Sequence, residues 1–550
     1  MPNLRDASGQ RRPVDLNLTS WVPDAPPYAN PGFPLCANVY PSDLGFYRPM
    51  PQTFTEGNNT LLDLVATLTN VSGDLVGFRF IDTNAAHYYV TAVDNDADTL
   101  HFFKYEENTS TWADVTPVGG VTSQFGSYGR YATFGTDIYC AYGIAGQIVA
   151  KDAGDTTPFL VVTDAPRAQD IAVIRGFMVA INVTEFGVNT RNGVSWSAAG
   201  DPTNWINPNT DPIGALSVLR GFTTLQGGGR LQRIVPGVSG SDAIIFGQSK
   251  IWRMTFIGPP SVWDFQVVEE REGTQRESTV VSDGTLIYYY GLRGWMVFDG
   301  VRSARIGAGK VDRAFIDELT QGGLFRYNPG DLSRFAGGLS SAISGEPFSD
   351  KLVFWAYRAN RQATLANIAT DGGDLIVTDQ GDNIVASIQT EFNNTLLIHN
   401  QTTGEWGNSN AVLQAIGRTP TDRTSSDNPG MIGIDTDFSL VRFTRLETLN
   451  AFIDTLETRG DSQARITVKR VWPQVESADV TISLLSRENL KAPQVQSAPK
   501  GLEDDAAVPV FESGRYVALR IVFPLDDRWH SGLQGVTAEF ADQGLGSVGS

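Results

Sequence analysis

The chain has 550 residues, of which 41% are hydrophobic and 19% are charged. This length exceeds the roughly 250–300 residues that one core supports, and the apolar content excludes a globally disordered chain. We therefore expect several domains or a repeat fold. The net charge of −19 argues against a broad nucleic-acid-binding face, because phosphate contacts need basic side chains. Cys36 and Cys140 fit neither a disulfide framework nor a CxxC metal site, so we expect a reducing cytoplasm.

The first sixty residues (1–60) are predicted to be an extended, proline-rich segment. Eight prolines occur from Pro23 to Pro51, which disfavours long helices and central strands. Trp21, Phe33 and Tyr47 are too apolar for a free linker, so the segment is expected to pack on a platform or on a neighbouring molecule. No apolar signal segment starts the chain, and no run of 18 apolar residues predicts a membrane span.

Residues 61–439 are predicted to form a β-propeller with about five to seven degenerate blades. Runs of five to eight residues rich in Val, Ile, Tyr, Phe, Trp and Thr alternate with turns, as strands require. Trp252 and Met296 occupy equivalent places in two similar hairpins, and Tyr139 and Met178 do so in another pair. Their separations of 44 and 39 residues match the length of a propeller blade.

The stretch "LIYYYGLRGWMVFDG" at 286–300 gathers five aromatic residues around one turn. Such a group forms either the packing layer between two sheets or a shelf for a ligand. Because aromatic residues recur in the related hairpins, the packing interpretation is favoured. Trp295 is therefore predicted to be a blade-packing residue.

The remaining segments predict one helix and a second sheet-rich domain. Apolar residues spaced four apart favour a helix at 310–319, whereas 442–457 is interpreted as strand. Alternating runs at 464–473, 478–487 and 514–524 predict a β-sandwich-like platform domain over residues 440–550, with a disordered tail.

No catalytic, cofactor-binding or metal site emerges from the motifs. Asp94, Asp96 and Asp98 imitate the start of a calcium loop, but Thr99 and Tyr105 replace its required glycine and glutamate. A solvated hairpin turn is the favoured interpretation, and a surface cation is the alternative. Acidic clusters such as 267–273 leave open a pair of carboxylates that acts on glycans.

One basic loop opposes the acidic character of the chain. Arg220, Arg230 and Arg233 lie close together in sequence, beside the glycine-rich stretch 226–229. Glycine permits close backbone approach to a partner. The loop is therefore predicted to be mobile and to face either DNA or an acidic neighbouring subunit, with ordinary solvated surface as the alternative.

An ordered set of motifs resembles the tail nozzle, or tail tubular (packaged-DNA stabilisation), proteins of short-tailed bacteriophages. The motifs are "CANVYPSDLGFYRPMP", "VSWSAAGDPTNW", the stretch 249–300, "RIGAGKVDRAF", and "GRYVALRIVFP" followed by "HSGLQGVTAEF". The resemblance implies an all-β chain, in which a β-propeller joins a β-rich platform or sandwich domain formed by N- and C-terminal segments. It also implies a hexameric ring below the portal and the adaptor, with a central channel for DNA.

On this resemblance the protein is a structural part of the virion tail, assembled in the host cytoplasm. It is expected to have no enzymatic activity and no cofactor. Its expected partners are five further copies of itself, the adaptor or head–tail connector, tail fibre or spike proteins, and double-stranded DNA that passes without sequence-specific binding. The alternative function is a propeller that binds or hydrolyses a host glycan. A trimeric receptor-binding fibre is a further rival.

Overall fold

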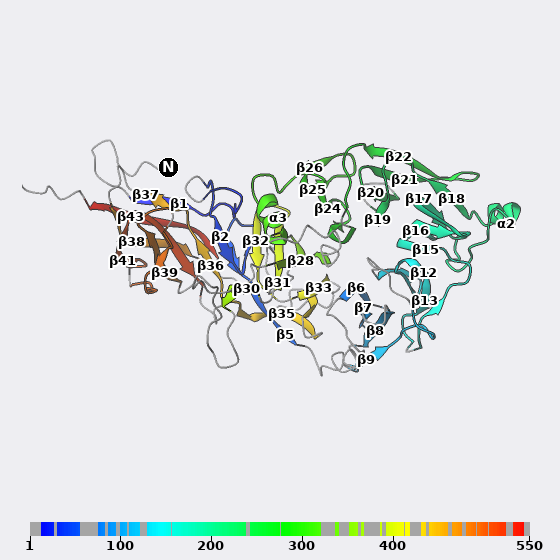
Figure 1. Ribbon diagram of the computed structural model, residues 1–550, viewed down its shortest axis with the longest axis horizontal. Helices are drawn as coiled ribbons and strands as arrows, with labels where there is room; N and C mark the ends of the chain where they lie inside the picture. The colour runs from blue at the N-terminus through cyan, green and yellow to red at the C-terminus, as the bar shows by residue number, and fades with distance from the viewer. Residues whose placement is uncertain are drawn as a thin grey trace, which may run out of the picture.

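The structure is a computed structural model. It describes residues 13–26, 30–55, 75–82, 86–94, 99–106, 109, 111–121, 129–155, 157–237, 242–275, 277–320, 336–339, 351–360, 365–367, 385–387, 392–411, 413–418, 431–435, 439–459, 465–475, 480–490, 492–503, 505–523 and 532–543. More than half of these residues lie in antiparallel strands, and few lie in helices. A ring of small sheets lies beside a sandwich of larger sheets, as Figure 1 shows. The predicted all-β class with a propeller and a platform is confirmed.

The ring consists of seven blades within the described residues. The first blade holds β6 (Leu75–Asp82), β7 (Ala86–Asp94), β8 (Thr99–Glu106) and β9 (Thr111–Asp114). The second holds β10 (Arg130–Phe134), β11 (Asp137–Ala141), β13 (Val149–Asp152) and β14 (Leu160–Val161). The third holds β12 (Gly143–Gln147), β15 (Arg167–Ile174), β16 (Phe177–Glu185), β17 (Val188–Trp196) and β18 (Gly221–Thr224). The fourth blade holds β19 (Leu231–Pro236), β20 (Ala243–Gly247), β21 (Ile251–Gly258) and β22 (Val262–Glu269). The fifth holds β23 (Val281–Ser282), β24 (Ile287–Gly291), β25 (Gly294–Phe298) and β26 (Ser303–Arg305). The sixth blade holds β27 (Ala336–Leu339), β28 (Leu352–Asn360), β31 (Phe392–Asn400) and β32 (Trp406–Ser409). The seventh holds β33 (Leu413–Arg418), β34 (Met431–Asp435), β35 (Leu440–Thr448) and β5 (Pro51–Thr55). A separate two-stranded sheet pairs β29 (Leu365–Asn367) with β30 (Val385–Ser387).

Neighbouring blades contact one another through the first strand of each sheet, or in the third blade through β15, its second strand. Strand β6 contacts β10, β10 contacts β15, and β15 contacts β19, while β33 contacts both β27 and β6. The final blade takes its outer strand from the other end of the chain, since Thr53 and Thr55 of β5 pair with Phe443 and Val441 of β35. In one of the two hairpin pairs matched in the sequence, Trp252 and Met296 both lie on the third strand of a blade. In the other pair, Tyr139 lies on the second strand of its sheet and Met178 on the third.

The platform is a sandwich of two sheets built from both ends of the chain. The first sheet continues the sixth blade through β3 (Val39–Pro41), β4 (Tyr47–Pro49), β43 (Leu533–Gln543), β38 (Arg465–Val475) and β41 (Val508–Gly514), and β1 (Val14–Asn17) pairs with β43. The second sheet holds β2 (Leu35–Ala37), β36 (Phe452–Asp454), β42 (Tyr516–Val522), β39 (Thr481–Arg487), β40 (Val495–Gln496) and β37 (Thr458–Arg459). Alternating residues such as Ile466, Ile482 and Leu519 fill the space between the sheets.

The N-terminal segment packs on the platform, and it does so with strands that the prolines were expected to exclude. Strands β3 and β4 lie in the middle of the ten-stranded sheet, so the expectation of no central strand is wrong. The physical reason is their brevity. Each is three residues long, and β3 meets β32 through Val39 alone, while β4 meets β43 through Tyr47 alone. The prolines stand at the strand ends, where no ladder hydrogen bond is lost.

The aromatic stretch at 286–300 is a packing layer. Trp295 has no exposed surface, and its ring lies 4.3 Å from that of Trp355 and 6.0 Å from that of Trp406. Phe315 of α3 (Asp312–Thr320) covers the same ring at 5.2 Å. These residues belong to the same apolar cluster as the interior of the sandwich. The aromatic layer therefore joins the propeller to the platform.

The helices are few and short in the part of the chain that the structure describes. Helix α3 confirms the prediction at 310–319, and β35 and β36 confirm strand within 442–457. A second short helix, α2 (Pro212–Ser217), was not predicted; Asp211 caps it, accepting a hydrogen bond from the backbone nitrogen of Gly214 at 2.8 Å. No described helix has the length and apolar character to cross a membrane.

We predict that Trp295→Ala lowers the free energy of unfolding by about 3–5 kcal/mol, because it leaves a cavity at a fully buried site. Thermal or urea unfolding measures the loss. Leu292→Ala, in the exposed turn of the same hairpin, is the control and should change stability little. Wild-type stability of Trp295→Ala would refute the packing role.

We also predict that acid weakens the junction through His399. Burial lowers the pKa of His399 to about 3, and Lys310 adds to this, so the folded protein keeps the ring neutral between Tyr288 and Trp406. The unfolded chain binds the proton near pH 6.5, so stability falls by up to about 1.4 kcal/mol per unit as pH drops from 6.5 towards 3. The variant His399→Phe should flatten this part of the pH–stability curve. An unchanged slope would contradict the assignment.

Candidate functional site

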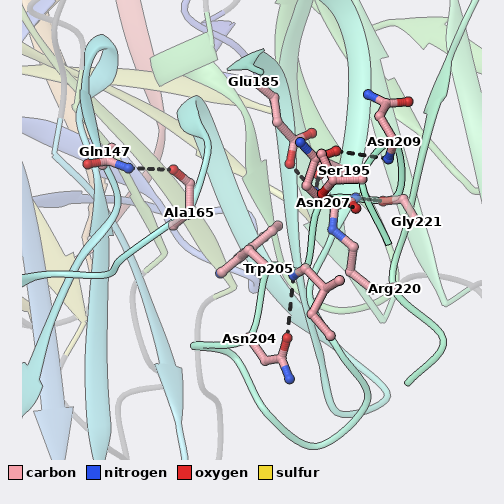
Figure 2. A network of polar contacts seen from close by, with 12 residues as sticks. Gln147, Ala165, Glu185, Ser195, Asn204, Trp205, Asn207, Asn209, Arg220 and Gly221 are labelled. Carbon is pink, nitrogen blue, oxygen red and sulfur yellow. Dashed lines mark hydrogen bonds and ion pairs between the residues drawn. The ribbon is translucent and has the colours of Figure 1, made fainter. Parts of the chain in front are cut away.

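A cavity of about 900 Å³ opens at the rim of the third blade. Three segments line it: Gln147 with residues 164–167, the hairpin tip 184–187, and the loop 205–210. Strand register brings the first two together, because Arg167 of β15 pairs with both Gln147 of β12 and Thr184 of β16. Its volume lies within the range of roughly 300–1,000 Å³ that is typical of ligand sites, so we take it as the candidate site. Figure 2 shows the polar contacts around it.

The hairpin tip between β16 and β17 is a tight two-residue turn. Glu185 pairs with Val188, which leaves Phe186 and Gly187 as the turn residues, with φ of +53° and +78°. Turns with two positive φ angles favour Asn-Gly or Asp-Gly, and a bulky residue at the first place is strained. Nevertheless Phe186 occupies that place, and 41% of its surface is exposed beside the cavity.

The back wall contains a buried ion pair. Arg220 donates to a carboxylate oxygen of Glu185, to Ser195 Oγ at 3.2 Å and to the carbonyl of Gly221 at 2.8 Å, as Figure 2 shows. The Arg220 side chain has no exposed surface and the Glu185 side chain has 4%. Burial raises the pKa of the Glu185 carboxyl and lowers the pKa of Arg220, while the attraction between the two charges opposes both changes.

Aromatic rings enclose the guanidinium group of Arg220. Its central carbon lies 5.6 Å from the centre of the Phe186 ring and 5.7 Å from that of Trp205. Trp205 is buried in the apolar cluster between the second and third blades, and its indole nitrogen donates to the carbonyl of Pro202 at 2.9 Å. The hairpin tip and the loop therefore meet over one fixed cation.

Short side-chain caps fix the loop that carries Trp205. Asp201 accepts hydrogen bonds from the backbone nitrogen and the hydroxyl of Thr203, at 3.0 and 2.7 Å. Asn204 accepts from the nitrogen of Ile206 at 3.4 Å, and Asn207 accepts from that of Asn209 at 2.9 Å. Asp and Asn favour such turns, so the motif "DPTNWINPN" at 201–209 specifies an ordered loop.

The basic loop lies next to this site but has partners inside the chain. Arg220 is buried and therefore does not face DNA or a neighbouring subunit, which corrects that part of the prediction. Arg230 donates to Gln169 at 2.6 Å, and Arg233 pairs with Asp170 at 2.8 Å, so both tie the fourth blade to the third. Part of the Arg233 side chain is exposed. A DNA or subunit partner for Arg230 and Arg233 stays a prediction.

The glycines beside these arginines serve the interior of the same chain. A Cβ atom on Gly228 would lie 1.9 Å from the Trp252 ring, so only glycine fits there. Gly227 and Gly229 have φ of +81° and +75°, which favour glycine as well. The close backbone approach inferred from the sequence exists, but its partner is Trp252.

The other sequence candidates do not form a reactive centre in the described residues. Asp94 ends β7, whereas Asp96 and Asp98 lie outside the described residues. No group of three potential metal ligands occurs among the residues that the structure places. In the acidic stretch 267–273, Glu269 accepts a hydrogen bond from the backbone nitrogen of Ser303, and Glu272 is buried in an ion pair with Arg293. Both carboxylates have structural partners.

Sequence reasoning missed the cavity. Its walls combine residues from three separate segments, and of these only Trp205 stands in one of the quoted motifs, "VSWSAAGDPTNW". The one available signal was Phe186-Gly187 between two strands, where a turn that favours Asn-Gly carries an aromatic residue instead.

Comparisons with known proteins leave the family open. No family model matches the chain, and no curated protein does. Among solved structures, an exo-β-1,3-galactanase from Phanerochaete chrysosporium is 10% identical, with a TM-score of 0.27 over 88% of this chain and all of the other. A GH93 α-L-arabinofuranosidase of Fusarium graminearum is 10% identical, with a TM-score of 0.28 over 50% of this chain and 92% of the other. A nidogen/laminin complex is 14% identical, with a TM-score of 0.27 over 42% of this chain and 78% of the other. At such TM-scores nothing about this chain can be concluded from the likeness.

We predict that Glu185→Leu alone lowers the free energy of unfolding by about 3–5 kcal/mol, because Arg220 is left buried without its counter-ion. The double variant Glu185→Leu/Arg220→Met should recover most of the loss. Urea unfolding of the wild type, both single variants and the double variant measures the coupling, and additive effects would contradict the pairing. Arg175→Met is the control, because the Arg175 side chain in the ion pair with Asp242 is 60% exposed. This substitution should change the free energy of unfolding by less than about 1 kcal/mol.

Proposed function

We propose that the protein is a structural component of a bacteriophage tail. It forms a hexameric nozzle or hub ring below the portal and the adaptor, retains packaged DNA and provides its exit channel. The observation that carries this proposal is the architecture: a propeller whose sixth blade continues into a platform made from N- and C-terminal segments. This is the arrangement that the resemblance to tail nozzle proteins implies. On this proposal the protein resides in the virion tail.

A rigid junction supports a role in which the subunit transmits force. Domains of one chain move relative to each other unless their interface is large and apolar. Here a continuous ten-stranded sheet and the cluster of Trp295, Trp355 and Trp406 connect the two parts. A ring that holds pressurised DNA needs subunits without a hinge at this place.

The charge distribution supports a channel through which DNA slides. Each contact between phosphate and a basic side chain adds salt-dependent affinity, and hence friction. The chain carries a net charge of −19, and Arg220, Arg230, Arg233 and Arg253 all donate to acceptors of the same chain. Both facts reduce the attraction of the subunit for a passing duplex.

A second function, recognition of a bacterial glycan by the propeller, is favoured by one observation. The cavity beside Phe186 combines an exposed aromatic ring with polar side chains, as a carbohydrate site requires. A tail component near the host surface could carry such a site without being an enzyme. Surface plasmon resonance of the purified protein on immobilised cell-surface polysaccharide tests this function, and an absence of binding would overturn it.

For the main proposal, we predict a closed six-fold ring when the protein is mixed with its adaptor. Mass photometry should give a species of six chains of 59.7 kDa on the adaptor, and class averages should show six-fold symmetry. Only monomers or trimers would refute the nozzle. Trimers would favour a receptor-binding fibre instead.

A further inference from the structure

We propose that Lys104 and Lys151 form a proton-operated latch between the first and second blades, which tightens when the pair loses one proton. The two side chains come from β8 of the first blade and β13 of the second. The latch is a property of the propeller itself. It goes beyond both functions proposed above and does not depend on either of them.

The two ammonium groups bind the same backbone carbonyl. Lys104 Nζ donates to the carbonyl oxygen of Asp155 at 2.9 Å, and Lys151 Nζ donates to the same oxygen at 2.6 Å. The two nitrogens are therefore close neighbours, separated by no more than the sum of these distances. A carbonyl oxygen has two lone pairs and can accept both bonds. Two positive charges this close repel each other where little water screens them.

Both lysines are buried without a counter-ion in contact. Lys104 is 1% exposed and Lys151 is 6% exposed. Within the part of the chain that the structure describes, neither ammonium group forms an ion pair with a carboxylate. Lysine is rarely buried unless it is paired. A pair of buried lysines that share one neutral acceptor is therefore a place where the fold favours the loss of a proton.

The surroundings act on the two amines in the same direction. Burial and then the charge of Lys104 lower the pKa of Lys151 to about 8, and burial lowers the pKa of Lys104 as well. The carboxylates of Asp152 and Asp155 oppose both changes from a greater distance, and Glu106 opposes the second. Because the two amines repel each other when charged, the first proton to leave belongs to the pair rather than to one residue.

The loop that carries the shared carbonyl joins the two blades. Tyr89 of β7 donates from its hydroxyl group to the carbonyl of Ala153 at 2.9 Å, and Lys104 of β8 donates to that of Asp155. Both bonds run from the first blade to the loop after β13. Tyr89 keeps its proton, because burial raises the pKa of its hydroxyl group well above the ordinary value.

Loss of one proton removes the repulsion and keeps the hydrogen bond. A neutral amine still donates to a carbonyl oxygen, so both bonds to Asp155 can persist when the pair carries a single charge. The Lys151 nitrogen lies 6.0 Å from the ring centre of Tyr89 and 5.8 Å from that of Phe159, inside the aromatic cluster between the two blades. The doubly charged pair therefore loosens this contact, and the singly charged pair tightens it.

The effect on stability has a defined sign. The ordinary pKa of lysine is 10.5, whereas Lys151 in the folded chain holds its proton only to about pH 8. Between these values the unfolded chain binds more protons, so stability rises with pH, by up to about tenfold in the folding equilibrium constant per pH unit. Buried tyrosines act in the opposite direction near pH 10, because folding raises their pKa values. The latch is therefore tested between about pH 7.5 and 9.5.

The test measures the protons and the contact separately in the full chain. NMR of the ε-carbons in ¹³C-lysine-labelled protein follows each titration, and the chain has eight lysines to assign. Hydrogen exchange, corrected for its intrinsic pH dependence, measures the protection of residues 149–155, and urea unfolding measures stability.

Four variants separate charge from side-chain shape. Lys151→Met removes the charge and keeps an unbranched stem, and Lys104→Met is its reciprocal. Lys151→Arg keeps a charge that cannot be lost in this pH range. Lys469→Met is the control, because Lys469 lies on the platform, is 46% exposed and pairs with Glu539.

We expect one proton to leave the wild-type pair below about pH 9, and the protection of residues 149–155 to rise by up to about tenfold per pH unit. Lys151→Met should raise the pKa of Lys104 and show high protection already at pH 7.5. Lys151→Arg should stay poorly protected throughout, and Lys469→Met should match the wild type. Titration of both lysines near pH 10.5, or a Lys104 pKa that Lys151→Met leaves unchanged, would overturn the shared proton. Protection that stays constant while the proton leaves would overturn the latch.

Discussion

Closure of the propeller by strand β5 determines how both parts of the molecule are assembled. The seventh blade is complete only when residues 51–55 pair with β35, almost four hundred residues later in the chain. The segments on either side of that closure, β3 and β4 before it and β36 after it, are thereby placed in the platform. The pairing that closes the ring thus fixes where the chain passes between the ring and the platform. Loop-closure entropy opposes contacts of such separation, so this pairing depends on the packing around it.

The aromatic layer lies elsewhere, in the apolar cluster shared with the platform, whereas Val441 and Phe443 at the closure pack in a separate cluster with Tyr40 and Met50. Trp295 comes from the fifth blade, and Trp355 and Trp406 come from the sixth, where the sheet passes into the platform. Two of these side chains also form hydrogen bonds from the sixth blade to segments that flank the fifth. The indole nitrogen of Trp355 donates to the carbonyl of Thr279 at 2.9 Å, and the indole nitrogen of Trp406 donates to the carbonyl of Ile306 at 3.3 Å. The contact between the fifth and sixth blades therefore combines an apolar core with specific polar contacts.

Sequence reasoning succeeded for features that periodicity decides, and it failed where distant segments meet. The strands of the blades, the packing role of Trp295 and helix α3 could be predicted from spacing and residue type, because these act locally. The central position of β3 could not, because the sequence does not show that its strand is only three residues long and pairs with β32 through one residue. Arg220 looked like a loop cation because Glu185, its partner, lies 35 residues earlier, on another strand. Composition cannot show which charges are paired across strands.

Both hairpin tips of the third blade that follow β15 and β16 carry a bulky residue with positive φ, Arg175 and Phe186, each followed by glycine. At several turns glycine occupies the position with positive φ, as at Gly135, Gly284 and Gly294. At the cavity an aromatic residue, Phe186, takes such a position, and two polar atoms nearby are buried without partners. Both features reduce the stability of the folded chain, and neither is needed for closure, since β16 and β17 pair along their length. Natural sequences are locally consistent except where function opposes stability. Because the tip Arg175-Gly176 departs from the same rule outside the cavity wall, backbone strain at Phe186 alone does not mark a ligand site.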